Sequence, residues 1–547
     1  MRSGIFRCLR TGSEWQSMKN KTIPIVVGVS GHRKIASEDR EAISAAVRET
    51  LVSIQNRCRH SEVMLLNSLA EGGDLLCADV ARALGIPILV PLPLERTDYE
   101  NDFSETEKEH FASHCDAAAE CFVVSPIEKR EDMPKRDFAY RQASIYVATH
   151  AHILLALWDG SESAPNGCGT AFAVDAALHD AFCSSEGASP DGCRTVVQIY
   201  TPRGERSDYP AGTKRILGAA ASFEELCDRT DEFNRLASDK DTGKAYPVLP
   251  EELETDAALD RFAEIHAAAE TLSNGYSKRF RWILALLSIA STVLTMAFLL
   301  YDEAELHWMI LVCGAMLLSA FFLRRIAERT AAHRRYLEYR TLEEGVRVQI
   351  YLRYAGSRVE PAALMTWTQK QETGWVASAL AVLGIGPAPV KSHDISDCWI
   401  EDQRVYHEKA SARAKRRRGG SEGVVRTALW ISILLYLSAL LFEILCGLFG
   451  KGILPPFDAD PYRTLLKILL GSVSAAALFI SNYYGKLSLS RNHSDHEKME
   501  RFFRHMEERL KRQGQSEALL LVLAREELSE NGNWCSYQRD NTPDFSI

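Results

Sequence analysis

The chain has 547 residues, too many for one hydrophobic core, so we expect two or more structural units. Its net charge of −9, with 25% charged residues, argues against a generally basic nucleic-acid-binding protein, and we expect no nucleic-acid partner. The 13 cysteines form no CxxC pair and no Cys/His grouping at zinc-ligand spacing, which predicts reduced thiols and no metal site.

The N-terminal part of the chain is predicted to be an α/β domain. Residues 1–20 lack an apolar stretch long enough for a secretory signal, and we expect a disordered leader there. Within 21–249, nearly continuous apolar runs predict buried parallel strands: IPIVVGV, VMLLNSL, IPILVPL, CFVVS, HILLALW and TVVQIY. Helical segments fit between them, at 38–55, 73–84 (stopped by Gly85), 104–114, 137–149 and 170–181. This alternation predicts a Rossmann-like, doubly wound parallel sheet.

Glycine-bearing turns follow several of these predicted strands. The first strand runs into GVSGHR, the second into SLAEGGD and the fifth into WDG, and GCGT opens the next helix. Ligands of such domains bind at the carboxyl ends of the strands. Glycine permits close backbone approach, and the N–H groups at a helix start attract phosphate. We therefore predict a phosphate-facing pocket in which His32 and Arg33 are donors.

Four of these stretches together resemble the SLOG superfamily, which groups DprA-like, LOG-like and TRPM-type sensor domains. They are GVSGHR, SLAEGGDLLCADVARALGIPILVPLP, AYRQASIYVATHAHILLALWDG and GCGTAFAVDAAL, within residues 23–205. A SLOG domain ahead of membrane spans is similar to bacterial effectors of anti-phage defence. The resemblance implies a nucleotide-derived ligand, often related to NAD or ADP-ribose, and no other cofactor. It assigns the ligand contacts to Gly28, Ser30, Gly31, His32, Arg33, Ala70, Glu71, Gly72, Gly73, Asp74, Asp159, Gly160, Gly167, Gly169 and Thr170.

The same resemblance bears on catalysis. LOG-type hydrolases carry PGGxGTxxE with a catalytic glutamate, whereas this chain has PNGCGTAFAVD, which places Ala173 at that position and Asp175 nearby. We therefore expect a sensor with no catalytic residue. A membrane-tethered LOG-like hydrolase and a non-catalytic scaffold are the alternatives. Glu71 and Asp74 could instead cap the helix that starts at residue 73, and His32 could be a satisfied turn histidine.

Four later apolar runs, 280–301, 306–323, 427–449 and 465–484, each have near the roughly 20 residues that a membrane-spanning helix needs. The second is short, and a buried core helix is its alternative. Basic residues, including the KRRR run at 415–418, flank one side of the runs, and the loops within each pair are acidic. We therefore expect a multi-pass protein of the bacterial inner membrane with both termini cytoplasmic.

The remaining boundaries follow from these runs. We expect a connecting helix at 250–279, membrane hairpins at 280–325 and 427–484, and cytoplasmic segments with amphipathic helices at 326–426 and 485–547. Glu443 and Lys467 are expected either to meet or to snorkel to the interface. Small residues at 471–477 permit close helix contact, so we expect a homo-oligomer in the lipid bilayer. The expected function is a ligand-gated membrane effector. The patterns at 205–249 and 356–401 predict no role.

Overall fold

The computed structural model describes residues 21–125, 133–162, 168–179, 194–203, 209–218, 220–239, 256–389, 391–449, 460–486 and 489–540. The predicted leader, 1–20, lies outside these residues. The chain divides into two compact units, each assembled from separate stretches of sequence. The first contains 1–272, 340–395 and 515–532, and the second contains 273–339, 396–514 and 533–547.

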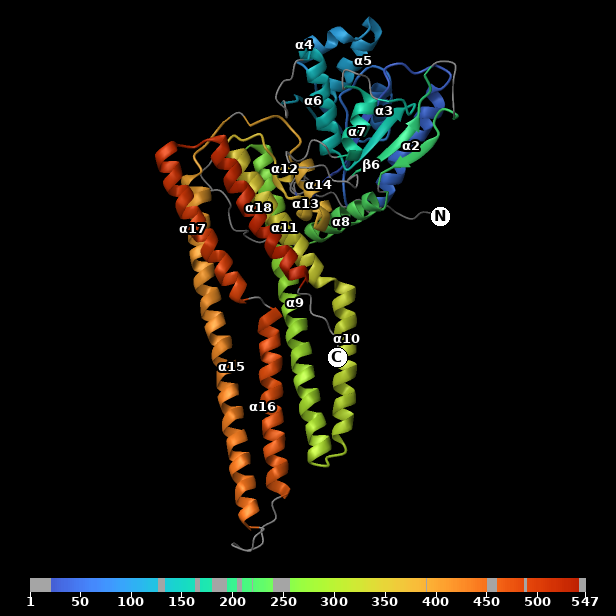
Figure 1. Cartoon of the computed structure of the whole chain (residues 1–547). Helices are drawn as coiled ribbons and strands as arrows, with labels where there is room; N and C mark the ends of the chain where they lie inside the picture. The colour runs from blue at the N-terminus through green and yellow to red at the C-terminus, as the bar shows by residue number, and fades with distance from the viewer. Residues whose placement is uncertain are drawn as a thin grey trace. The chain divides into compact units, whose positions relative to one another are not determined.

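A seven-stranded sheet lies at the centre of the first unit, in the order β4-β3-β2-β1-β5-β6-β7 (Figure 1). All neighbouring strands are parallel except β6 and β7. The strands are β1 (Ile25–Gly31), β2 (Val63–Leu66), β3 (Ile88–Leu92), β4 (Glu120–Val123), β5 (Ile153–Trp158), β6 (Thr195–Tyr200) and β7 (Lys214–Leu217). The helices that alternate with them or follow them are α2 (Arg40–Arg57), α3 (Gly73–Ala83), α4 (Arg96–Tyr99), η1 (Glu100–Asp102), α5 (Glu105–Asp116), α6 (Lys135–His150), α7 (Thr170–His179) and α8 (Ala220–Ser238).

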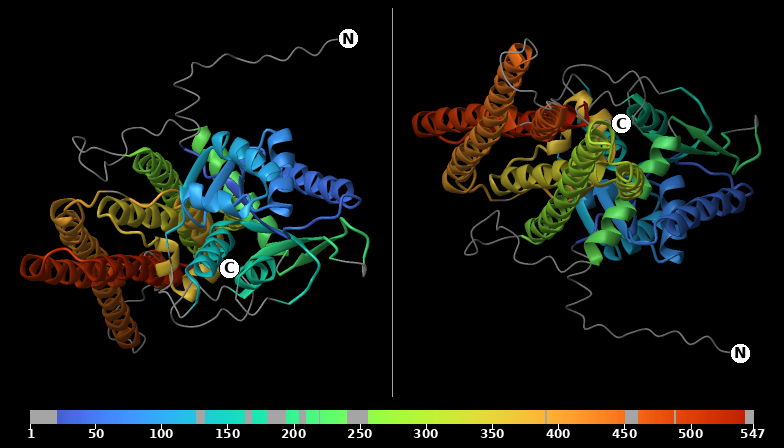
Figure 2. Two further views of the ribbon diagram at one scale, coloured as in Figure 1. Left: turned by 90° about the horizontal axis from the view of Figure 1, so that it is seen from above. Right: turned by 90° about the horizontal axis from the view of Figure 1, so that it is seen from below.

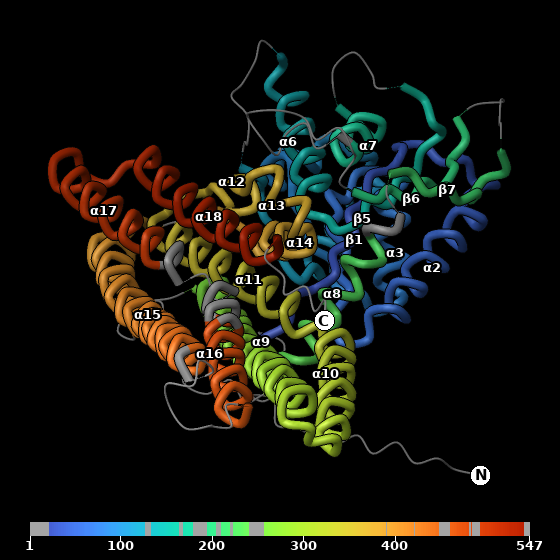
Figure 3. The backbone as a smooth tube through the Cα atoms, turned by 60° about the horizontal axis from the view of Figure 1, so that its bottom comes forward, coloured from blue at the N-terminus to red at the C-terminus, as the bar shows by residue number. Residues whose placement is uncertain are grey.

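Both faces of the sheet are covered, because successive strand residues enter two different hydrophobic cores. Val27 and Leu65 belong to one core, together with residues of α2, α3 and α5. Their neighbours Val26 and Leu66 belong to the other core, together with residues of α6 and α7. Figure 3 shows α2 and α3 on one side of β1 and β5, and α6 and α7 on the other. Five of the six apolar runs read from the sequence are thus confirmed as largely buried strands. The sixth, CFVVS, forms the edge strand β4, where Cys121 and Val123 are exposed, so its predicted burial on both faces was wrong.

The edge strand β7 escaped the sequence analysis. It pairs antiparallel to β6, and its residues are mostly exposed. A short strand of sequence KRIL has no apolar run to reveal it. By contrast, the predicted end of α3 is confirmed, because Gly85 follows the helix with a φ of 69°.

Segments far along the chain complete the first unit. They include α12 (Pro361–Leu364), α13 (Trp367–Glu372) and α14 (Gly374–Leu383). His150 Nε2 on α6 lies 2.9 Å from Glu360 Oε1, and the backbone N–H of Gly386 donates to Tyr146 Oη at 3.2 Å. Two parts of the region 356–401, which suggested no role from sequence, therefore contact α6 beside the sheet.

The second unit is helical. It contains α10 (Met309–Thr330), η2 (Ser396–Glu401), α15 (Asp402–Phe449), α16 (Asp460–Lys486) and α17 (Leu489–Gln513). Three further helices have residues in both units, namely α9 (Ala257–Glu303), α11 (Ala332–Tyr354) and α18 (Glu517–Asp540).

Three helical stretches of the described residues are long and apolar enough to cross a membrane: Ala257–Glu303, Met309–Tyr354 and Ser396–Gly447. The first of them contains the predicted run 280–301, and the other two contain most of the runs 306–323 and 427–449. The fourth run, 465–484, lies on α16, where part of the side chains fall outside the described residues, and its membrane crossing stays a prediction.

Side-chain contacts hold these apolar helices together within the second unit. Helices α9 and α10 lie side by side (Figures 1 and 2), and Cys313 Sγ lies 4.0 Å from the carbonyl oxygen of Leu294. A Cβ at Gly471 on α16 would come within 2.8 Å of Leu299 Cδ1 on α9, so this small residue permits close contact within the chain.

Of the two predicted alternatives, the ion pair is not formed, because Glu443 and Lys467 do not pair with each other. Glu443 instead binds Arg463 through two hydrogen bonds of 2.7 and 2.8 Å. Lys467 lies 2.9 Å from Glu303 on α9. Arg463 lies one turn before Lys467 on α16, and Glu303 lies on a different helix. Helix spacing alone could not predict which of these charged residues would pair with Glu443 and Lys467.

Candidate anion-binding site at the carboxyl edge of the sheet

Most of the predicted site residues meet at one edge of the sheet. β1 lies between β2 and β5, so the strand order reverses beside it, which is where open α/β sheets bind ligands. Along this edge lie the residues that end or follow β1 (Ser30, Gly31, His32, Arg33), those that precede or open α3 (Ala70, Glu71, Gly72, Gly73, Asp74), those after β5 (Asp159, Gly160) and those at the start of α7 (Gly169, Thr170).

Two predicted residues are not brought to this edge. Gly28 is buried within β1, and a Cβ there would lie 2.8 Å from Ala151 Cβ and 3.0 Å from Val147 Cγ1. Gly28 is therefore a packing glycine that lets α6 approach the sheet. Gly167 lies outside the described residues.

The first glycine turn has a structural task in addition to the predicted one. A Cβ on Gly31 would lie 2.8 Å from the Cα of Gly73, and a Cβ on Gly72 would lie 2.2 Å from the carbonyl oxygen of Arg33. The N–H of Gly73 donates to the carbonyl oxygen of His32 at 2.9 Å. Hence β1 and the start of α3 touch backbone to backbone, and this N–H group is already used.

His32 is buried next to Asp159. Its Nε2 accepts the backbone N–H of Asp159 at 3.2 Å and also lies 3.1 Å from Asp159 Oδ1. Burial lowers the pKa of His32, nearby Arg203 lowers it further, and the contacts with Asp159 oppose the decrease. In the neutral ring Nε2 either accepts from the backbone or donates to the carboxylate, so the imidazole has two alternative partners on one residue.

Asp74 is enclosed beneath the loop that precedes α3. Asn67 Nδ2 donates to the carbonyl oxygen of Asp74 at 2.7 Å, and the backbone N–H of Ala70 donates to Asp74 Oδ2 at 3.4 Å. Burial raises the pKa of Asp74 to about 7, although the N–H groups of Gly31 and Ala70 and the charge of Arg33 favour its ionised form. No side chain caps α3 at its N-cap residue, Gly72, but Asp74 lies in the first turn of this helix, where an acid is favoured by the helix dipole, so that alternative stays open.

Three arginines act on this edge, two of which the sequence analysis did not single out. The exposed Arg33 follows β1, and its guanidinium lies 5.6 Å from the ring centre of Tyr140 on α6. Arg141, also on α6, lies 4.6 Å from the ring centre of Phe172 on α7. Arg203 follows β6 and acts on His32. Their positive charges make this edge attractive to an anion.

The start of α7 is the open part of the edge. Gly169 is exposed with a φ of 99°, and a Cβ there would meet no atom of the described residues within 4 Å. Burial and Asp137 raise the pKa of Cys168, while Arg33 and Arg141 lower it, which places both guanidinium groups within electrostatic range of the residue before Gly169. An anion at this helix start would meet N–H groups and two arginines together.

Two buried polar atoms close to Arg33 lack partners. Asp74 Oδ1 and Tyr140 Oη have no hydrogen-bond partner among the described residues. Buried polar groups are almost always hydrogen-bonded, and because both atoms are closed to solvent, water or a ligand reaches them only if the surrounding side chains move.

The position that would carry catalysis in a LOG-like hydrolase faces the core. Ala173 is 1% exposed and belongs to the hydrophobic core on the α6 and α7 side of the sheet. Asp175, the nearest acid, lies on α7 with an exposed side chain.

No protein-family model matches the chain, and no curated protein matches it closely enough to count as a relative.

Proposed function

We propose that the first unit is a Rossmann-like, SLOG-like sensor that binds a nucleotide-derived anion, related to NAD or ADP-ribose, at the carboxyl edge of the sheet. The observation that carries this proposal is the convergence of Arg33, Arg141 and the open start of α7 where the strand order reverses. The negative charge of the ligand's phosphates accounts for the arginines.

The second half of the proposal is that the chain is a four-pass membrane effector. Support comes from large apolar side chains with wide exposure on three helices, such as Trp282 (69%), Leu311 (74%) and Leu434 (63%). A bilayer would cover surfaces of this kind. Basic flanks such as Arg416 and the acidic loop around Glu305 orient both termini toward the cytoplasm. In the bacterial inner membrane, a ligand that favours one arrangement of a homo-oligomer would make the membrane leaky, as an anti-phage effector does.

Ligand binding is tested on the full-length chain in detergent, by calorimetric titration with ADP-ribose, NAD, AMP and inorganic phosphate. We expect one of the nucleotides to bind more tightly than phosphate. Arg33→Ala should weaken binding by about 10- to 100-fold, because it removes a charge-assisted hydrogen bond worth about 1.5–3 kcal/mol. Lys34→Ala is the matched control, since Lys34 is the adjacent exposed cation and should leave affinity unchanged. Failure of every nucleotide to bind would refute the sensor.

Two further measurements separate the alternatives. Release of free base or ribose phosphate from the bound nucleotide, abolished by Asp175→Asn, would establish the hydrolase instead. Dye leakage from vesicles containing the chain, triggered by the bound nucleotide and lost in Arg33→Ala, is the result expected of the effector. Binding without leakage would restrict the proposal to sensing.

A further inference from the structure

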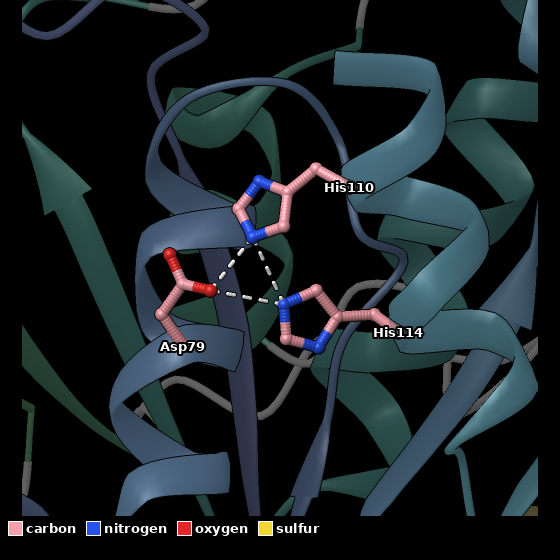
Figure 4. A group of neighbouring side chains, drawn as sticks. All are labelled: Asp79, His110 and His114. Carbon is pink, nitrogen blue, oxygen red and sulfur yellow. Dashed lines mark hydrogen bonds and ion pairs between the residues drawn. The ribbon is translucent and has the colours of Figure 1, made fainter. Parts of the chain in front are cut away.

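A cluster of three metal-ligand side chains lies on the α3 and α5 side of the sheet, separate from the residues of the anion site. Asp79 is on α3, and His110 and His114 lie one turn apart on α5, so both imidazoles are on the same helix face. Figure 4 shows the three side chains converging on one point. The sequence analysis missed this group because Asp79 precedes His110 by 31 residues, and only folding brings α3 against α5.

The spacing of the two imidazole nitrogens fits a tetrahedral metal centre, whereas both nitrogen-to-carboxylate distances are those of hydrogen bonds and would lengthen when a metal binds. His110 Nε2 lies 2.7 Å and His114 Nε2 lies 3.0 Å from the same oxygen, Asp79 Oδ1, and the two Nε2 atoms are 3.3 Å apart. Zinc–nitrogen bonds of about 2.0–2.1 Å at tetrahedral angles separate two ligand atoms by about 3.3–3.4 Å. The two nitrogens thus already have the spacing of zinc ligands.

Glu107 orients one of the two rings for metal binding, whereas no described group forms a hydrogen bond with Nδ1 of His114. Glu107 Oε2 lies 3.2 Å from His110 Nδ1, so it can hold the proton there and leave the Nε2 lone pair for a metal. The His114 side chain is 1% exposed, whereas His110 and Asp79 are 31% and 43% exposed. One side of the centre is thus anchored in protein, and the other is open to water as a fourth ligand. Arg40 lies 3.8 Å from Asp79 Oδ2, the oxygen that does not face the imidazoles.

We propose that Asp79, His110 and His114 bind one Zn²⁺ ion, which links α3 to α5 and keeps one coordination position for water. Two imidazoles and a carboxylate form a ligand set suited to zinc, and three protein ligands leave the fourth position open. This proposal does not depend on the nucleotide-binding function, because it uses none of the residues of the anion site.

The test measures zinc on the full-length chain in detergent, after removal of metal by a chelator. We expect one equivalent of Zn²⁺ to bind by calorimetry and by elemental analysis after dialysis. Glu107→Gln should weaken the affinity by about 10- to 100-fold, because it alters only the support of His110. His110→Ala should weaken it more. His60→Ala, which removes an exposed histidine elsewhere in the first unit, should have no effect.

Cobalt distinguishes this site from zinc held by cysteines. Co²⁺ bound by nitrogen and oxygen ligands gives visible ligand-field bands without sulfur-to-cobalt charge transfer, and these bands should disappear in His110→Ala. Circular dichroism establishes that each variant is folded. The proposal fails if the wild-type chain binds no zinc, if Asp79→Asn and His110→Ala bind it as tightly as wild type, or if the cobalt spectrum shows thiolate ligands.

Discussion

The carboxyl group of Asp74 lies in surroundings that disfavour its negative charge. It is buried beneath the loop before α3, and burial raises its pKa to about 7. An acid in the unfolded chain has a pKa of about 3.9. Between these two values the unfolded chain releases a proton that the folded chain keeps, so unfolding becomes easier as the pH rises from about 4 to about 7.

We therefore expect Asp74→Asn to remove part of the pH dependence of stability. Between pH 5 and pH 7 the wild type should lose on the order of 2 kcal/mol relative to the variant, and above pH 7 the difference should level off. The lowered pKa of His32 acts in the opposite direction, destabilising the fold as the pH falls, but it is present in both proteins and cancels in the comparison. Hydrogen exchange of the sheet amides at several pH values measures the difference. A constant difference from pH 5 to pH 8 would contradict the raised pKa.

At the scale of elements, the contact between β1 and α3 fixes the geometry of the candidate anion site. Gly31 and Gly73 face each other at a separation that leaves no room for a side chain, and the carbonyl oxygen of His32 accepts the N–H of Gly73. The turn that places Arg33 at the edge is therefore held by backbone contacts. These glycines were predicted to contact phosphate, whereas in the structure they let β1 and α3 pack closely together.

Gly31→Ala should destabilise the first unit, by about 1–3 kcal/mol, because the new methyl group would meet the backbone of α3, which cannot move aside cheaply. Gly374→Ala is the matched control. Gly374 starts α14 in the same unit, and a Cβ there meets nothing within 4 Å, so this variant should be as stable as wild type. Hydrogen exchange or limited proteolysis of the sheet compares the two. Equal stability of both variants would show that β1 and α3 can separate without cost.

On the scale of the whole molecule, the sequence predicted what depends on neighbouring residues and missed what depends on distant ones. Apolar runs and helical spacing predicted the parallel strands and their helices, because burial on both faces leaves a continuous pattern. The same reasoning could not place 340–395 in the unit that contains the sheet, nor pair Asp79 with His110, nor choose Arg463 as the partner of Glu443. In each case the segments involved are far apart in the sequence, and no local sequence pattern indicates that they come together.

The number of membrane crossings is decided by cysteine labelling of intact cells with a membrane-impermeant maleimide, measured above the background of the wild type. Glu305→Cys, in the loop after the first predicted span, should be labelled from outside. Arg416→Cys, in the basic run before the third, should be labelled only after permeabilisation. Arg501→Cys on α17 decides whether α16 crosses the membrane. If there are four spans, this cysteine should be labelled only after permeabilisation, like Arg416→Cys. If there are three, it should be labelled in intact cells.

Helix α3 is held at two places. Its first residue is pressed against β1, and Asp79, less than two turns later, contacts α5. If zinc at Asp79 restrains α3, it also limits how far the start of α3 at Gly73 can move when an anion binds. A thermodynamic cycle then requires the anion to change zinc affinity by the same factor by which zinc changes anion affinity. The shared helix would make intracellular zinc a second input that sets the threshold for the signal.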